Sequence, residues 1–206
     1  MNIKKHWSVI KMKAPFIKRL VAYILDIIVV SIASAILALP FTMNDNYTKL
    51  YDNVMEVNTN YIKGEIDADT YTAQNIDASY DFAYAAVIVT IIQIVCYILY
   101  FGILPVYNKG QTVGKKLMHI KIQKSDDSKL GVNDMVIRAF IINSIFTSII
   151  TLLFTVFSNK TIYYYGSNAL VYLQDIIIVI SAFMILYRKD KRGLHDIICK
   201  TEVITV

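Results

Sequence analysis

The sequence predicts an all-α membrane protein with four transmembrane helices, both termini in the cytoplasm and a small cytoplasmic β element. Two bulk properties indicate a membrane: 56% of the 206 residues are hydrophobic and the mean hydropathy is +0.48, whereas a typical soluble domain is about 45–50% apolar. The apolar residues also form long blocks that are flanked by basic residues. We therefore expect a single multi-pass domain of residues 1–206 in the cell (plasma) membrane, with the lipid bilayer as a partner.

Four apolar blocks are long enough to span a bilayer. A helix needs about 20 residues to cross a hydrocarbon core of about 30 Å, because each residue adds about 1.5 Å. Lipid offers no hydrogen-bond partners, so these blocks are expected as helices rather than open strands. The first block is too long for the apolar part of a signal peptide and is interrupted by Asp26, which predicts an uncleaved helix. The predicted spans cover residues 16–40, 82–104, 135–157 and 169–187.

The basic residues set the direction of these spans. Lys and Arg are concentrated before the first span, in the loop 105–134 and after the fourth span, and they are sparse in the other two loops. The positive-inside rule therefore places the N-terminus, the loop 105–134 and the C-terminus in the cytoplasm. The same flanking positions account for the net charge of +5, so no nucleic-acid partner is expected.

The outer loop 41–81 is the longest connection, and it is acidic and rich in Tyr and Asn. Within it, residues 47–57 are expected to form a short helix and residues 68–81 to extend the second span outward. The acidic residues fit two interpretations, which are a vestibule or partner site that collects cations and a solvated loop.

Two cytoplasmic segments have the alternation of a half-buried strand. Met118, Ile120 and Ile122 alternate with polar residues in the loop 105–134, and residues 201–206 form a second strand-like run. Alternation of this kind indicates a strand with one buried face, and an isolated strand is unstable. We therefore predict that the two segments pair in a small sheet beneath the membrane.

Two carboxylates lie inside predicted spans, Asp26 in the first and Asp175 in the fourth. A charged residue near the centre of a bilayer costs about 3 kcal/mol on insertion scales, so both need a physical reason. Arg138, near the start of the third span, is a candidate partner for Asp26, or it snorkels to the lipid phosphates. Arg19 shares a helix face with Asp26, although its side chain leans toward the head groups. The two aspartates form either a structural hydrogen-bond lock or a relay for protons or ions.

Enzyme signatures are absent from the sequence. It contains neither a His-Glu-x-x-His zinc motif nor a Gly-x-Ser-x-Gly nucleophile elbow. Cys96 and Cys199 do not form a metal-ligand pair, and the stretch 110–116 is one residue too short for a nucleotide-binding P-loop. We expect no catalytic activity, no metal and no cofactor.

Several short stretches, taken in order, resemble the RDD family of bacterial membrane proteins. They are 18–22 followed by Asp26, 110–117 followed by 120–122, Arg138, and 194–196 followed by 200–203. The resemblance covers most of the chain and implies the four-helix fold and topology. It also implies that Asp196, just beneath the membrane, joins Arg19 and Asp26 in one set, whereas Asp175 lies outside the family pattern. The long outer loop departs from the family, for which transport of unidentified ligands has been suggested.

The residues and the resemblance leave two functions open, of which transport leads. A carrier of an unidentified ion or small ligand would bind a proton or cation at Asp26, with Arg19 or Arg138 tuning its charge. Because four helices make a thin wall for a pathway, this function implies a homo-oligomer. A non-catalytic accessory or assembly protein would instead use the same charges, together with Asp196, to hold the cytoplasmic end of the bundle together.

Overall fold

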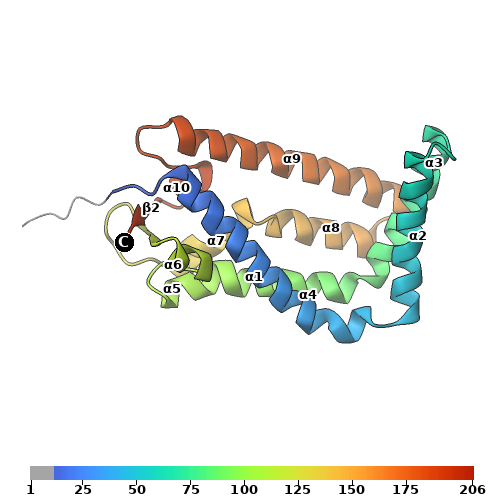
Figure 1. Cartoon of the computed structure of the whole chain (residues 1–206), viewed down its shortest axis with the longest axis horizontal. Helices are drawn as coiled ribbons and strands as arrows, with labels where there is room; N and C mark the ends of the chain where they lie inside the picture. The colour runs from blue at the N-terminus through green and yellow to red at the C-terminus, as the bar shows by residue number, and fades with distance from the viewer. Residues whose placement is uncertain (1–11) are drawn as a thin grey trace, which may run out of the picture.

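The computed structural model describes residues 12–206; the first eleven residues, which include three lysines of the predicted cytoplasmic N-terminus, lie outside the described part. The membrane-spanning helices lie along one long axis of the molecule (Figure 1). Three are continuous and a fourth is a bent pair, so the all-α membrane fold is confirmed, and the orientation of the termini stays a prediction. The spanning elements are α1 (Phe16–Thr42), the run Val87–Tyr107, the pair α7 (Val132–Ile142) and α8 (Ile145–Phe157), and α9 (Lys160–Tyr187).

The second span is continuous but contains a widened turn. It consists of α4 (Val87–Tyr97), the π-helical turn η1 (Ile98–Ile103) and α5 (Leu104–Tyr107). The π turn precedes Pro105, whose missing N–H cannot complete an α-helical ladder. The span begins at Val87 rather than at residue 82, because the preceding residues belong to a separate helix.

The third span differs from the continuous helix expected over 135–157. α7 and α8 are bent by 67° at Asn143–Ser144, where Ser144 has a left-handed backbone with φ of 55°. Asn and Ser side chains compete for local backbone hydrogen bonds and so weaken a helix where they occur together. The apolar pattern continues on both sides of this pair, and for that reason hydropathy does not reveal the break.

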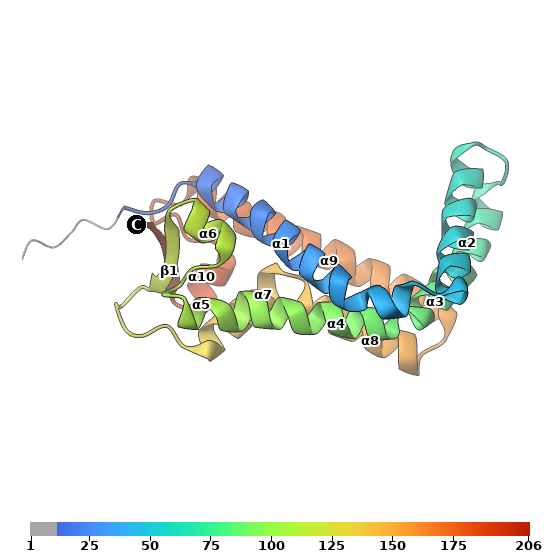
Figure 2. The same cartoon turned by 60° about the horizontal axis from the view of Figure 1, so that its bottom comes forward.

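A helical hairpin of α2 (Asp45–Ile62) and α3 (Ala68–Ala85) closes one end of the bundle, which we call the hairpin end. The Asn44 and Asp67 side chains each accept a backbone N–H from the first turn of the following helix, which is a standard helix start. Figure 1 shows the hairpin running across the ends of the spans, and Figure 2 shows that it also projects beyond the bundle. The outer loop is therefore more helical than expected, and α3 does not continue the second span outward.

The predicted sheet is present at the other end, which we call the sheet end (Figure 2). β1 (Ile120–Lys124) and β2 (Thr201–Thr205) are antiparallel, with Ile122 opposite Val203. The strand begins at Ile120 rather than at Met118, because the chain turns after α6 through a residue with φ of 53°. The buried residues of this end form one small core, which contains Ala14, Ala22, Ile120, Ile122, Met135 and Val203.

The helices pack unevenly around the bundle. α1 packs along α4 and against α6 (Val113–Leu117), while α9 packs along α8. α10 (Leu194–Ile198) fills the sheet end between α7, α9 and β2. α1 and α9 make no extended contact with each other. Large apolar side chains are exposed along the spans, for example Ile24 and Ile28, each 50% exposed, as expected for helices that face lipid.

Candidate functional site

Asp196 is the centre of a buried ion cluster at the sheet end. Its side chain is fully buried and receives Arg19 from α1 at 3.0 Å and Arg138 from α7. The N–H of Gly193 donates to the same carboxylate at 3.0 Å, so Asp196 also caps its own helix α10. His195 Nε2 lies 3.4 Å away. One carboxylate thereby joins α1, α7 and α10, which are far apart in the sequence.

The two arginines extend this connection to the strands. Arg19 also donates to the carbonyl oxygens of Ala14 (3.1 Å) and Val203 (3.2 Å). Arg138 also donates to the Thr201 hydroxyl at 2.7 Å. Because a guanidinium presents several donors in a fixed plane, each arginine can hold a carboxylate and a second acceptor together. The sheet is therefore fastened to the spans through charged side chains.

The surrounding charges and burial set the protonation states of Asp196 and His195 on α10. Burial alone would raise the pKa of Asp196, but Arg138, His195 and Arg19 together hold it well below its ordinary value of 3.8. Burial, followed by the nearby Arg138, lowers the pKa of His195 from 6.5 to about 4. At neutral pH the cluster therefore contains two guanidinium cations, one carboxylate and a neutral imidazole.

Asp26 is also fully buried, but it lies in a different environment. Its Oδ1 accepts the Tyr100 hydroxyl at 2.7 Å and the N–H of Gly114 at 2.7 Å. Its Oδ2 accepts the Thr112 hydroxyl and the Lys115 ammonium, the latter at 3.3 Å. The expected pairing of Asp26 with Arg138 is replaced by these donors, since Arg138 binds Asp196. The carboxylate fastens the start of α6 to α1.

Asp175 lies apart from both groups. It is exposed on α9, and neither a hydrogen bond nor an ion pair joins it to another residue in the range 12–206. Its neighbour Gln174 points inward and donates to the carbonyl of Ile141 at 2.8 Å. Of the five residues singled out from the sequence, Arg19, Arg138 and Asp196 meet, Asp26 is fixed separately and Asp175 faces outward.

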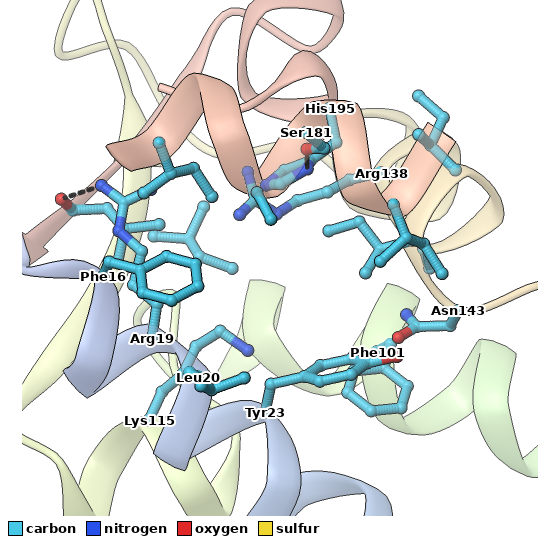
Figure 3. A pocket seen from close by; sticks show the side chains of 18 of the residues that line it. Phe16, Arg19, Leu20, Tyr23, Phe101, Lys115, Arg138, Asn143, Ser181 and His195 are labelled. Atoms are coloured by element: carbon cyan, nitrogen blue, oxygen red, sulfur yellow. Dashed lines mark hydrogen bonds between the residues drawn. The ribbon is translucent and has the colours of Figure 1, made fainter. Parts of the chain in front are cut away.

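A pocket of about 160 Å³ adjoins the ion cluster, between α1, α7 and α9 (Figure 3). Its polar end is lined by Arg19, Lys115 and Arg138, and Figure 3 shows the Lys115 ammonium directed into the pocket. The rest of the lining is mostly apolar and includes Leu20, Met135, Ile141, Ile178 and Ala182.

The charges at this end of the pocket do not balance. The three cations of Arg19, Lys115 and Arg138 are paired with two carboxylates, Asp26 and Asp196. Burial lowers the pKa of Lys115 and the neighbouring Asp26 opposes that shift; with Lys115 protonated, one cation among these five pocket-side groups is in excess. All three cationic side chains are largely buried, at 9%, 14% and 7% exposure. A buried charge without a counter-charge is unfavourable, so this wall of the pocket favours an anion.

A second cavity of about 190 Å³ lies at the helix break, among α1, α4 and α8. Its polar lining includes Thr90, Gln93, Ser144 and Ser148. Asn143 and Tyr23 line both cavities, so the two are neighbours. The Asn143 Oδ1 is buried and has no hydrogen-bond partner among residues 12–206, which leaves an acceptor for a bound molecule.

Ser181, His195 and Asp196 form a row in the order of a hydrolase triad. Ser181 Oγ lies 2.9 Å from His195 Nδ1 and also accepts the N–H of Leu194 at 3.1 Å. The low pKa of His195 makes it a weak base near neutral pH, and Asp196 is already held by two arginines. The row connects α10 to α9. In the described part of the chain, no group of three His, Cys, Asp or Glu side chains could hold a metal ion.

A family model described as the RDD family matches residues 13–200. This chain belongs to the RDD family. One relative, the Bacillus subtilis (strain 168) protein named "Uncharacterized protein YxaI", is 24% identical over 191 residues, covering 93% of this chain and 96% of the relative. No solved structure matches.

In this RDD protein, the sequence analysis did not identify three side chains that bind Asp26, namely Tyr100, Thr112 and Lys115. The sequence partly indicated these partners. The stretch 110–116 has the glycines and lysines of an anion-binding loop, although it does not match the P-loop motif. In the structure, Thr112, Gly114 and Lys115 of this stretch donate to the carboxylate of Asp26. Gly114 is required there, since a Cβ would lie 2.2 Å from the carbonyl oxygen of Ala22.

Proposed function

We propose that this RDD protein binds an amphipathic anion from the bilayer and carries it across. The ligand class is a molecule with an apolar body and a phosphate or carboxylate head. The observation that carries the proposal is the pocket of Figure 3, which is mostly apolar and ends in three buried cations matched by two carboxylates. An anionic head would restore neutrality where the protein leaves one positive charge unmatched.

The head of the ligand belongs at the polar end. Arginine guanidinium groups offer forked donors that suit phosphate and carboxylate oxygens, and lysine adds a compact charge. Arg19 and Arg138 are positioned by Asp196, so their donors are arranged before the ligand arrives. Pre-arranged donors reduce the free energy lost in ordering the site on binding.

The apolar body would enter sideways from lipid. The pocket lies between α1 and α9, which make no extended contact. Leu20 on α1 and Ile178 on α9 line the pocket and remain 40% and 37% exposed. A hydrocarbon chain can therefore pass from the bilayer into the pocket between these helices without crossing polar surface. At the far end, the free acceptor of Asn143 could receive a hydroxyl or amide N–H.

The same geometry disfavours uptake of a proton or cation at Asp26. That carboxylate already accepts four donors, of which one is a lysine ammonium. A cation would displace several of these bonds and would enter a region with an excess positive charge. Transport of an anion therefore agrees better with the buried charges than the cation carrier considered from the sequence.

A binding experiment tests the proposal with a filled-pocket variant. Purified protein would be titrated with dodecyl phosphate and laurate, and with zwitterionic dodecylphosphocholine as the matched-chain control, by native mass spectrometry. Ala182→Phe places a ring in the pocket, while Ala169→Phe adds the same ring to an exposed position of α9. We expect Ala182→Phe alone to weaken binding of the anionic probes by about tenfold or more, equivalent to about 1.4 kcal/mol. Equal binding of all three probes, or no effect of Ala182→Phe, would reject the pocket as an anion site.

Movement of the ligand separates a carrier from an accessory protein. In proteoliposomes with a short-chain fluorescent phosphatidic acid, a carrier raises the fraction of label that an external quencher destroys, and Ala182→Phe abolishes the increase. The accessory function is favoured by one observation, namely that Arg19, Arg138 and Asp196 hold α1, α7, α10 and β2 together. Binding of the anion without movement would support that function, with the pocket occupied by a fixed lipid.

A further inference from the structure

The cavity at the helix break lies near the middle of the membrane-spanning bundle. It has a volume of about 190 Å³ and is lined by residues of α1, α4 and α8. Ile27, which lines it on α1, lies 11 residues after Phe16 and 15 residues before Thr42. At about 1.5 Å per residue, these separations are about 16 Å and 22 Å. Lipid offers no hydrogen bonds at this depth, so a polar group beside the cavity needs a partner inside it.

The lining of this cavity is polar, uncharged and unpaired. It includes seven residues with a hydroxyl or amide group, which are Tyr23, Thr90, Gln93, Tyr97, Asn143, Ser144 and Ser148. Among residues 12–206, none of these seven side chains makes a hydrogen bond. Asn143 is the most buried of them, at 8% exposure, and its enclosed Oδ1 receives no donor. Figure 3 shows its amide directed toward Tyr23, which lines the same cavity.

The broken helix adds backbone donors at the same place. Ser144 and Ile145 line the cavity where α8 begins, and the Ser144 side chain does not cap the helix. A helix leaves its first N–H groups without an internal partner, and those of Ile145, Phe146 and Thr147 find no acceptor among residues 12–206. The Asn143 acceptor is adjacent in sequence to these donors. The cavity therefore offers both an acceptor and donors that the chain itself leaves unused.

We propose that this cavity binds the hydroxyl groups of an uncharged ligand. A hydroxyl group both donates and accepts, so it can donate to Asn143 Oδ1 and accept an N–H at the start of α8. A charged group would be unfavourable there, because the lining contains no counter-charge. The volume of about 190 Å³ is roughly six times the ~30 Å³ that a water molecule occupies in the liquid, so a small polyol fits.

The hydroxyl groups can come from two sources, which are a soluble polyol and the glycerol head of an uncharged lipid. Gln93 lines the cavity and is also exposed on α4, so a ligand can reach the cavity from the bilayer. The site is distinct from the anion pocket, since Thr90, Gln93 and the start of α8 line this cavity alone. The proposal therefore stands without a bound anion.

Native mass spectrometry with three probes tests the ligand class. The protein would be purified in an amine-oxide detergent, which carries no hydroxyl group. 1-Monolauroylglycerol has a lauroyl chain and a dihydroxy head, methyl laurate has the same chain without a hydroxyl group, and erythritol has hydroxyl groups without a chain. We expect monolauroylglycerol to bind at least about tenfold more tightly than methyl laurate. Binding of erythritol as well would identify a soluble polyol as the source, and binding of monolauroylglycerol alone would identify a lipid.

Matched threonine variants test the location. Thr90→Val removes a hydroxyl group from the cavity and keeps the shape of the side chain, and Thr151→Val makes the same change on α8 outside the lining of both cavities. We expect Thr90→Val to weaken binding of the hydroxylated probes by about fivefold, equivalent to about 1 kcal/mol, and Thr151→Val to leave it unchanged. Asn143→Leu removes the enclosed acceptor and should weaken binding at least as much. Thr90→Val keeps the test valid if Asn143→Leu alters the helix break.

Two results would overturn the proposal. Equal binding of monolauroylglycerol and methyl laurate, without binding of erythritol, would mean that the cavity recognises no hydroxyl group and holds only water. Equal effects of Thr90→Val and Thr151→Val on the hydroxylated probes would mean that these probes bind elsewhere on the protein.

Discussion

Asp26 and Asp196 are both fully buried, yet the protein stabilises them in different ways. Asp26 is held by two hydroxyl groups, one backbone N–H and one lysine, which come from η1 and from α6 with its N-cap residue Thr112. Asp196 is held by two arginines from α1 and α7. The first arrangement is electrically balanced and fixes one local segment. The second joins distant elements and leaves a positive charge, so the preference for anions that we propose would originate at the arginines around Asp196.

The largest expected effect is at Asp196. Asp196→Ala would leave Arg19 and Arg138 buried beside each other without a counter-charge. Breaking a buried ion pair by removing one partner typically costs about 3–5 kcal/mol, and we expect a loss of this size. Unfolding in mixed micelles with increasing SDS would measure it. Asp190→Ala is the control, because its partner Arg188 is 46% exposed and surface pairs contribute about 0–1 kcal/mol. Equal losses of stability in Asp196→Ala and Asp190→Ala would show that the buried ion cluster contributes no more than a surface ion pair.

The next effect is a pH dependence that originates at His195. Burial and Arg138 lower its pKa from 6.5 to about 4 in the folded protein, so between these values the unfolded chain binds a proton that the folded chain does not. The resulting stability is complete above pH 6.5 and is lost as the pH falls toward 4. The shift corresponds to about 3 kcal/mol.

The pH effect is checked by unfolding His195→Gln and wild type across this range. The variant should show a flatter profile between pH 6.5 and 4. Asp196 adds no pH dependence in this range, because its pKa in the folded protein lies well below 3.8 and its contribution to stability is lost only at lower pH. A wild-type profile that is already flat in this window would contradict a neutral, buried His195.

The local attachment at Asp26 should be more sensitive to shape than to charge. In Gly114→Ala the new Cβ would lie 2.2 Å from the carbonyl oxygen of Ala22 and 2.9 Å from Asp26 Oδ1. The segment must move and loosen its N–H bond, and we expect a loss of about 2 kcal/mol. Gly131→Ala is the control, since its Cβ would approach only a side-chain atom of Asp134, at 3.3 Å. Thermal unfolding of both variants measures the difference.

The regular parts of the fold could be predicted from the sequence. Apolar blocks predicted the spans, and alternation at Ile120 and Ile122 predicted the sheet that β1 and β2 form. The break at Asn143–Ser144 could not be predicted, because two polar residues barely change the hydropathy of a long apolar run. Hydropathy and alternation identify helices and strands whose conformation follows from their own residues. They do not identify a break of one or two residues within such an element.

The sequence identified several residues of the candidate site, but not which carboxylate each basic residue would bind. Depth in the membrane suggested Arg138 as a partner for Asp26, but the two carboxylates compete for donors and the geometry gives Arg138 to Asp196. The RDD resemblance grouped Asp196 with Arg19, and this pair is present at 3.0 Å. The donors of Asp26 come from a loop that is distant in sequence, and no periodic pattern reports such a contact.

The smallest effect concerns a single neutral donor of Asp26. Tyr100→Phe removes a hydroxyl that donates to Oδ1 at 2.7 Å and accepts the N–H of Val113 at 3.3 Å. Three donors remain on the carboxylate, so the loss should be about 1 kcal/mol, typical of one hydrogen bond. SDS unfolding in the same micelles measures it beside Asp196→Ala. If Tyr100→Phe were as damaging as Asp196→Ala, Asp26 would depend on one donor as strongly as Asp196 depends on its arginines. The redundancy of neutral donors would then no longer explain how a carboxylate remains buried there.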